Sequence, residues 1–214
     1  MNAIQTLVIS ALPIIFAITL HEAAHGYAAR HFGDPTAWQL GRISLNPLRH
    51  IDPVGTILVP GLILLVSSGG MLFGWAKPVP VNFSRLRKPK QDMLWVAAAG
   101  PAANFLMGIG WAVVLKLVAS MAPGMYSEAL MEMARAGIMI NGVLMMLNLL
   151  PLPPLDGGRI LVSLLPARAA YRFSRIEPYG FPILLLLLAL NVLGVILGPL
   201  LGIYFMLLRG LVGL

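Results

Sequence analysis

Long apolar stretches separated by short polar loops dominate the hydrophobicity pattern of this chain. Four of them have the length that a helix needs to cross a bilayer. They cover residues 1–31, 93–119, 129–150 and 179–208. The first is expected to run as one helix until Gly33-Asp34-Pro35 stops it, and Pro and Gly residues in the last should kink or break that helix. The pattern therefore predicts an all-α, polytopic membrane protein.

Two segments between the first and second of these stretches have a different pattern. Residues 36–46 alternate apolar and polar side chains around Gly41, and this period of two predicts a bent strand or short hairpin within a loop at 36–53. Residues 54–73 are apolar, but Pro60-Gly61 interrupts them. The second segment is either a full span or a re-entrant segment that dips into the bilayer and returns.

Clusters of basic residues indicate which side each loop occupies. Residues 75–92 and 159–175 are both rich in Lys and Arg, which favours the cytoplasmic side for both. The two spans between them then cross out and back. If residues 54–73 are re-entrant, the end of the first helix and the segment after Leu150 reach a similar depth near the cytoplasmic face. We therefore favour about four to five spans, a small membrane-associated β-hairpin or sheet, and a re-entrant segment.

The composition supports an integral membrane protein. Hydrophobic residues make up 58% of the chain and charged residues 11%, whereas a typical soluble domain has about 25% charged residues. The 214 residues suit a single transmembrane domain, 1–214, with the lipid bilayer as its surroundings. The net charge of +7 comes from loops beside apolar segments and does not indicate nucleic-acid binding. Because the chain has no cysteine, nitrogen and oxygen atoms must hold any metal.

The most informative motif is His21-Glu22-Ala23-Ala24-His25, which follows the first apolar run directly. Residues four apart share one face of a helix, so His21 and His25 can reach one cation. This H-E-x-x-H spacing is typical of a zinc site with the glutamate as general base. A surface helix with two histidines four apart by chance is the alternative, but polar residues inside a membrane span are costly and are functional candidates by default.

A catalytic zinc normally has three protein ligands, so one more is needed. Most of the eight acidic residues lie in loops or at segment ends, which leaves Asp156. It follows a proline-rich run that interrupts the helix at depth, and Gly157-Gly158 allow close backbone approach. The alternative is that Asp156 only caps a short following helix.

Together these motifs resemble the site-2 protease family of intramembrane zinc metalloproteases. The resemblance is carried by four motifs that cover most of residues 15–160. They are His21-Glu22-x-x-His25, Phe73 to Asn82 (FGWAKPVPVN), Gly100-Pro101-Ala-Ala-Asn104 and Asn148-x-x-Pro151-x-Pro153-x-Leu155-Asp156-Gly157. Larger relatives carry a PDZ or a cystathionine-synthase-type regulatory domain, which this chain lacks, so regulation and substrate selection are left open.

The resemblance implies one Zn²⁺ bound by His21, His25 and Asp156, with Glu22 as catalytic base. It also implies that Asn148 is an active-site group that holds the scissile carbonyl or its oxyanion, although a hydrogen bond within the helix packing is an equally good interpretation. The implied reaction is hydrolysis of peptide bonds within or beside membrane spans. In the family, substrates are typically membrane-anchored regulators or leftover signal segments.

A substrate helix must unwind before hydrolysis, and its freed backbone groups then need partners. An edge of the predicted strand, around Ile43 and Leu45, could supply them by strand addition. We expect an integral protein of a prokaryotic inner membrane, with its active site towards the cytoplasm. The competing functions are a transporter or metal permease, which would also use broken helices and buried polar groups, and a non-catalytic homologue that binds membrane helices.

Overall fold

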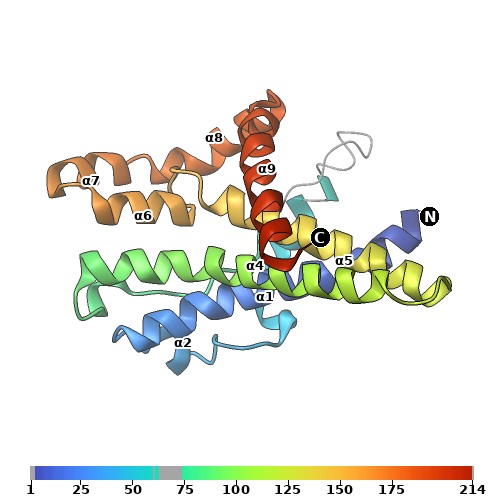
Figure 1. Cartoon of the computed structure of the whole chain (residues 1–214). Coiled ribbons are helices and arrows are strands. Elements are labelled where there is room, and N and C mark those ends of the chain that lie inside the picture. Colours follow the sequence, from blue (N-terminus) through green and yellow to red (C-terminus); the bar gives the residue numbers. More distant parts are fainter. Residues whose placement is uncertain (1–2, 60, 63–73, 214) are drawn as a thin grey trace.

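Three long helices form the centre of the protein (Figure 1). The computed structural model describes residues 3–59, 61–62 and 74–213. Helices α1 (Ala3–His31), α4 (Pro89–Ala119) and α5 (Met125–Asn148) pack along one another, with α4 in contact with both of the others. Helices α1 and α5 run in the same direction and α4 runs against them. This arrangement brings residues from all three helices to one interior region.

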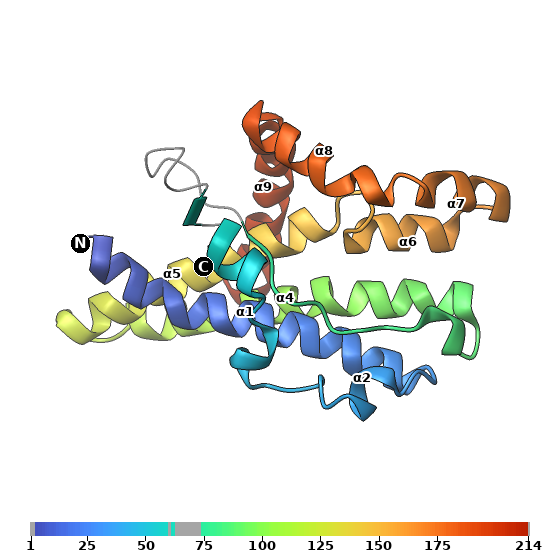
Figure 2. The same ribbon diagram turned by 180° about the vertical axis from the view of Figure 1, so that it is seen from behind.

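The bundle continues through four further helices. They are α6 (Asp156–Leu164), α7 (Ala167–Ser174), α8 (Glu177–Ala189) and α9 (Val192–Val212). Helix α6 packs against α4, and α7 lies beside α6, as the view from behind also shows (Figure 2). The predicted break in the last apolar stretch is confirmed, but it lies at Asn191, which has a left-handed φ of 56°, rather than at a proline.

Small residues let the C-terminal helix approach the bundle closely. Tyr204 of α9 is fully buried between Gly108 of α4 and Gly142 of α5, where an added Cβ would collide with its ring. Its hydroxyl donates to the carbonyl oxygen of Ile138 at 3.1 Å. This contact ties α9 to both long helices.

Four helices among the described residues are long and apolar enough to cross a membrane. They are Val8–His31, Pro89–Ala119, Met125–Asn148 and Val192–Val212, and the shorter apolar helix Glu177–Ala189 precedes the last of them. The prediction of an all-helical, multi-pass membrane protein is therefore confirmed. The boundaries of the spans predicted at 93–119 and 129–150 agree with the structure to within four residues.

The strand predicted over residues 36–46 is wrong. Residues Thr36–Gln39 form helix α2, and no strand occurs in the described part of the chain. The physical reason lies in Asp34, whose Oδ1 accepts hydrogen bonds from the backbone nitrogen and the hydroxyl of Thr36 and so starts a helical turn. Trp38 is half exposed and stacks against the Arg30 guanidinium instead of facing a sheet core.

Residues 40–53 continue without the predicted β-hairpin. Pro47–His50 is a 3-10 helix, and a π-helix, Pro53–Leu58, follows. Ile43 packs against Gly26 of α1 and Leu45 is 64% exposed, and because the backbone of residues 42–46 is irregular, neither residue forms a strand edge. The predicted re-entrant segment, 54–73, lies largely outside the described residues.

The extended segment 74–82 returns to the region where the π-helix begins. The Trp75 backbone nitrogen donates to the Gly55 carbonyl oxygen at 2.9 Å, and that of Lys77 donates to the His50 carbonyl oxygen at 2.8 Å. From there the segment runs along α1, and the backbone nitrogen of Asn82 donates to Asp34 Oδ2 at 2.6 Å.

Candidate metal centre

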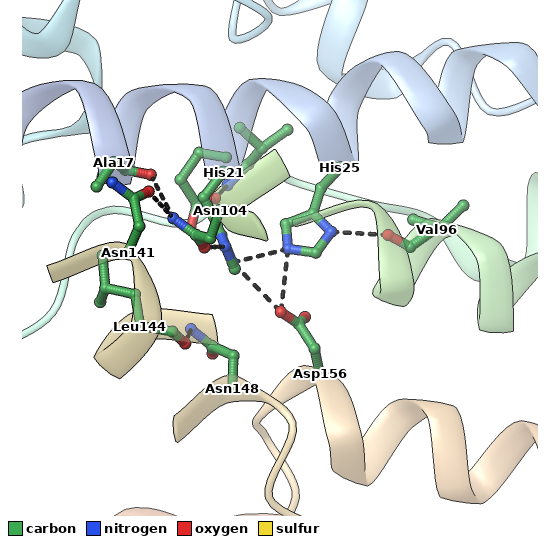
Figure 3. A network of polar contacts seen from close by, with 11 residues as sticks. Ala17, His21, His25, Val96, Asn104, Asn141, Leu144, Asn148 and Asp156 are labelled. Atoms are coloured by element: carbon green, nitrogen blue, oxygen red, sulfur yellow. Dashed lines mark hydrogen bonds and ion pairs between the residues drawn. The ribbon is translucent and has the colours of Figure 1, made fainter. Parts of the chain in front are cut away.

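Two imidazoles and a carboxylate meet at the interior face of α1 (Figure 3). The Nε2 atoms of His21 and His25 are 3.1 Å apart, as the i, i+4 spacing predicts. Oδ2 of Asp156 lies 3.2 Å from Nε2 of His21 and 3.3 Å from Nε2 of His25. The three residues lie far apart in the sequence, but their ligand atoms form a nearly equilateral triangle.

The turn before α6 places Asp156 against the histidines. An added Cβ at Gly157 would collide with the carbonyl of Leu149, and one at Gly158 would collide with the backbone of Pro153. Glycine is therefore required for the chain to fold back so tightly after α5. Asp156 is the first residue of α6, and its carboxylate faces the two imidazoles instead of capping the helix.

Hydrogen bonds on the far side of each ring orient both imidazoles. Nδ1 of His25 lies 2.7 Å from the carbonyl oxygen of Val96, which can only accept, so Nδ1 carries the proton. Nδ1 of His21 lies 2.6 Å from Oδ1 of Asn104, a second acceptor. With its proton on Nδ1, each ring has the lone pair of Nε2 available, and both Nε2 atoms face Asp156.

This set of atoms fits a tetrahedral zinc ion. Two imidazole lone pairs and a carboxylate oxygen converge, and Oδ2 of Asp156 is buried without a hydrogen bond from the described part of the chain. Three acceptors so close together repel one another unless a cation lies between them. Ligands arranged tetrahedrally about 2.0 Å from zinc are about 3.3 Å apart, which matches the observed triangle. His21 and Asp156 are 7% and 8% exposed, so the site is largely shielded from water.

Gly100 of α4 keeps space free beside this triangle. A Cβ on Gly100 would lie 2.6 Å from Nε2 of His21 and even closer to Nε2 of His25. Real side chains essentially never approach so closely. Helix α4 therefore leaves a space at the metal-facing atoms that any side chain would fill.

Glu22 occupies a neighbouring position on α1 but is not part of the triangle. Its Oε2 accepts a hydrogen bond from the backbone nitrogen of Val79 at 2.7 Å, within the extended segment 74–82. Glu22 is partly buried. The structure thus holds this carboxylate beside the two histidines through a main-chain donor.

The other predicted site residues are less directly involved. Asn148 is half-buried near the end of α5, and its amide donates to the Leu144 carbonyl oxygen at 3.0 Å within the same helix. Because this bond lies within a single helix, both the active-site role of Asn148 and the alternative hydrogen bond between packed helices stay predictions. Ile43 packs against Gly26, which follows His25 on α1, and Leu45 is exposed; their predicted role in substrate binding stays a prediction.

Sequence reasoning missed three residues around the site. The Gly100-Pro101-Ala-Ala-Asn104 motif contributed to the family resemblance without a role for its residues, yet Asn104 contacts His21 and also Asn141. Gly100 and Asn104 are four residues apart, so they share a face of α4. This spacing could have indicated that both residues face the same site. Asn141 is an isolated amide in an apolar stretch of α5, and a polar residue at such a position could also have indicated a functional role.

Comparison with known proteins identifies the family. Residues 117–190 match the model of Peptidase family M50. The chain is also 38% identical over 194 residues to the protein named "Putative zinc metalloprotease YwhC" from Bacillus subtilis, a match that covers 89% of this chain and 84% of that protein. The chain belongs to peptidase family M50. This M50 peptidase is therefore a membrane metalloprotease of the site-2 protease family, and zinc is its metal.

More distant relatives agree with this assignment. Rip2 of Mycolicibacterium smegmatis, whose name carries the same zinc metalloprotease description, is 30% identical to the M50 peptidase over 183 residues. That match covers 81% of this chain and 64% of Rip2. Rip2 of Mycobacterium tuberculosis is 29% identical over 148 residues, or 67% of this chain and 52% of that protein. No solved structure gave a significant match.

Proposed function

We propose that this M50 peptidase is an intramembrane endopeptidase that hydrolyses peptide bonds within or beside the membrane spans of other proteins. One observation carries the proposal: the His21, His25 and Asp156 triangle lies between helices that are themselves long and apolar enough to cross a membrane. Substrate segments in the bilayer would therefore meet the site at their own depth.

In this proposal, His21, His25 and Asp156 hold the zinc ion through Nε2, Nε2 and Oδ2. When bound there, zinc would supply Lewis acidity, which lowers the pKa of a water molecule towards neutral pH and polarises a peptide carbonyl. The hydrogen bonds from the two Nδ1 atoms fix the tautomer and the orientation of both rings before metal arrives. The chain thus provides a preformed set of three ligands.

Glu22 is the general base. It accepts a proton from the attacking water and later delivers it to the leaving amine, so the same carboxylate serves both halves of the reaction. The Val79 N–H holds Oε2 at 2.7 Å and so fixes the rotamer of the side chain. A carboxylate has two oxygens, and the second one takes the proton.

Asn148 is a candidate donor to the developing oxyanion. It lies at the end of α5, just before the turn that leads to Asp156. To act in this way its amide must leave the Leu144 carbonyl and rotate towards the substrate. Loss of one oxyanion donor costs about 2.7 to 4 kcal/mol in a well-studied protease, which would be easily measured here.

We further propose that residues 54–73 are re-entrant and that the site opens towards the cytoplasm of a prokaryotic cell. The hydrogen bond between Trp75 and Gly55 supports this topology, because it holds the two ends of the segment together. A full crossing would separate them by about 30 Å. The basic residues that follow, between Lys77 and Lys90, favour the cytoplasmic side.

Substrate docking remains a prediction for Ile43 and Leu45. Since they form no strand, any contact would come from the irregular chain that packs on α1 at Gly26, one turn beyond Glu22. Substrate backbone exposed by unwinding could pair with this chain in the bound state. Proline at both positions is expected to impair cleavage of a membrane substrate without removing zinc.

The decisive experiment uses purified protein in detergent and a tagged helical-hairpin membrane substrate. We expect cleavage in or beside the substrate's span, with Glu22→Gln abolishing it while zinc stays bound. Glu132→Gln is the matched control, because Glu132 pairs with Arg135 on the exposed side of α5 and should be neutral. Full activity of Glu22→Gln, or cleavage confined to soluble segments, would contradict the proposal.

A further inference from the structure

A chain of buried amides runs from the interior of α5 to the metal centre. Asn104 Nδ2 donates to Asn141 Oδ1 at 3.0 Å and to the Ala17 carbonyl oxygen at 3.2 Å. Asn141 Nδ2 in turn donates to the Gly137 carbonyl oxygen at 2.8 Å. Both asparagines are fully buried, so they are shielded from water that could replace these contacts.

We propose that Asn104 is a positioning residue that selects the zinc-binding tautomer of His21, and that Asn141 fixes the orientation of the Asn104 amide. This inference rests on the proposed role of His21 as a zinc ligand. It assigns a function to two buried polar residues that the proposed catalytic steps do not use.

The argument begins with the difference between the two histidines. His25 Nδ1 faces a backbone carbonyl, which can only accept a hydrogen bond, so its tautomer is set by the main chain. His21 Nδ1 faces a side-chain amide, which can present either its oxygen or its NH₂ group. A flipped amide would donate to Nδ1 and force the proton onto Nε2, where it would block metal binding.

The acceptors around Asn104 prevent that flip. The Ala17 carbonyl and Oδ1 of Asn141 both face its nitrogen, and the flipped amide would place an oxygen against them. The Asn141 amide is oriented by the Gly137 carbonyl in the same way. Each group donates a hydrogen bond to the next: His21 Nδ1 to Asn104, Asn104 to Asn141, and Asn141 to the Gly137 carbonyl oxygen. The orientation of the two amides therefore determines that the proton of His21 lies on Nδ1.

Two substitutions at one position separate this role from simple packing. Asn104→Asp keeps an acceptor for His21 but loses the donor to Ala17 and Asn141, whereas Asn104→Leu loses both. Changing a residue that orients a metal ligand typically lowers metal affinity about 10- to 100-fold. We expect a loss of that size in Asn104→Leu and affinity within about threefold of wild type in Asn104→Asp, even though both lower the melting temperature.

Zinc affinity is measured on purified full-length protein in detergent by competition with a chelator, and the absorption spectrum of the cobalt-loaded protein reports tetrahedral coordination. Asn141→Leu should lower affinity about tenfold, because Ala17 still restrains the amide. Tyr204→Phe is the matched control. It removes a buried hydrogen bond to Ile138 of α5 and should lower stability with unchanged zinc affinity.

Equal zinc affinity in Asn104→Asp and Asn104→Leu would overturn the inference, as would a loss in Tyr204→Phe equal to that in Asn141→Leu. If Asn104→Leu does not fold, Asn104→Asp and Asn141→Leu decide the matter alone, since only the second should weaken zinc binding. His21→Ala separates the two proposals. Unchanged zinc binding in that variant refutes the metal site itself. Zinc binding that is lost in His21→Ala but kept in Asn104→Leu and Asn141→Leu refutes only the positioning role.

Discussion

A single added methyl group at Gly100 should disable the metal centre. The Cβ of an alanine there would lie 2.6 Å from Nε2 of His21, whereas ordinary van der Waals contact begins at 3.4 Å. The imidazole would have to retreat by about 0.8 Å, and metal–ligand distances in a working site vary by only about 0.2 Å. His25 is approached even more closely, so both rings are affected.

We expect Gly100→Ala to lose at least one zinc ligand and therefore to bind zinc more than about 100-fold more weakly, which exceeds the usual effect of changing a residue that only orients a ligand. The assay is zinc content by elemental analysis after dialysis against a chelator, together with cleavage of a membrane substrate. Gly110→Ala is the control on the same helix, because its Cβ would meet no atom within 4 Å. Wild-type zinc content in Gly100→Ala would refute the reasoning from geometry.

Three further predictions concern residues that support the site. Val79→Pro removes the N–H that holds Glu22, so the turnover number should fall while zinc content stays at the wild-type level; an unchanged turnover number would show that this contact is dispensable. Gly180→Ala places a Cβ against the Pro153 carbonyl in the turn that leads to Asp156, so both melting temperature and zinc affinity should fall, and a fall in neither would contradict the assigned packing. Removal of zinc with a chelator should abolish cleavage and its return should restore it, whereas activity that survives complete removal would exclude a metalloprotease mechanism.

Local spacing made much of the site predictable. The positions of His21 and His25 follow from helical periodicity, and the zinc preference follows from their chemistry. The role of Asp156 was harder to predict, since proximity over more than a hundred residues cannot be read from periodicity. It could be inferred because few acidic residues lie at membrane depth and because the proline and glycine residues around it mark an interrupted helix.

The features that sequence reasoning missed depend on tertiary contacts. Residues 36–46 alternate in polarity, but the Asp34 carboxylate starts a helical turn at Thr36, and a four-residue helix is too short to have a clear period. In the sequence, Asn104 is a single polar residue among small ones. Its role becomes visible only in the structure, where it contacts α1 and α5 on either side. Which atom of its amide faces His21 is a property of three helices together.

The account depends most directly on how the metal is bound, and X-ray absorption at the zinc edge of the purified protein measures this. We predict one zinc per chain, with nitrogen and oxygen ligands at about 2.0 to 2.1 Å and outer-shell scattering from two imidazoles, one of which disappears in His25→Ala. A site with sulfur from methionine, with one imidazole or none in the wild type, or with unchanged scattering in His25→Ala would contradict the central claim.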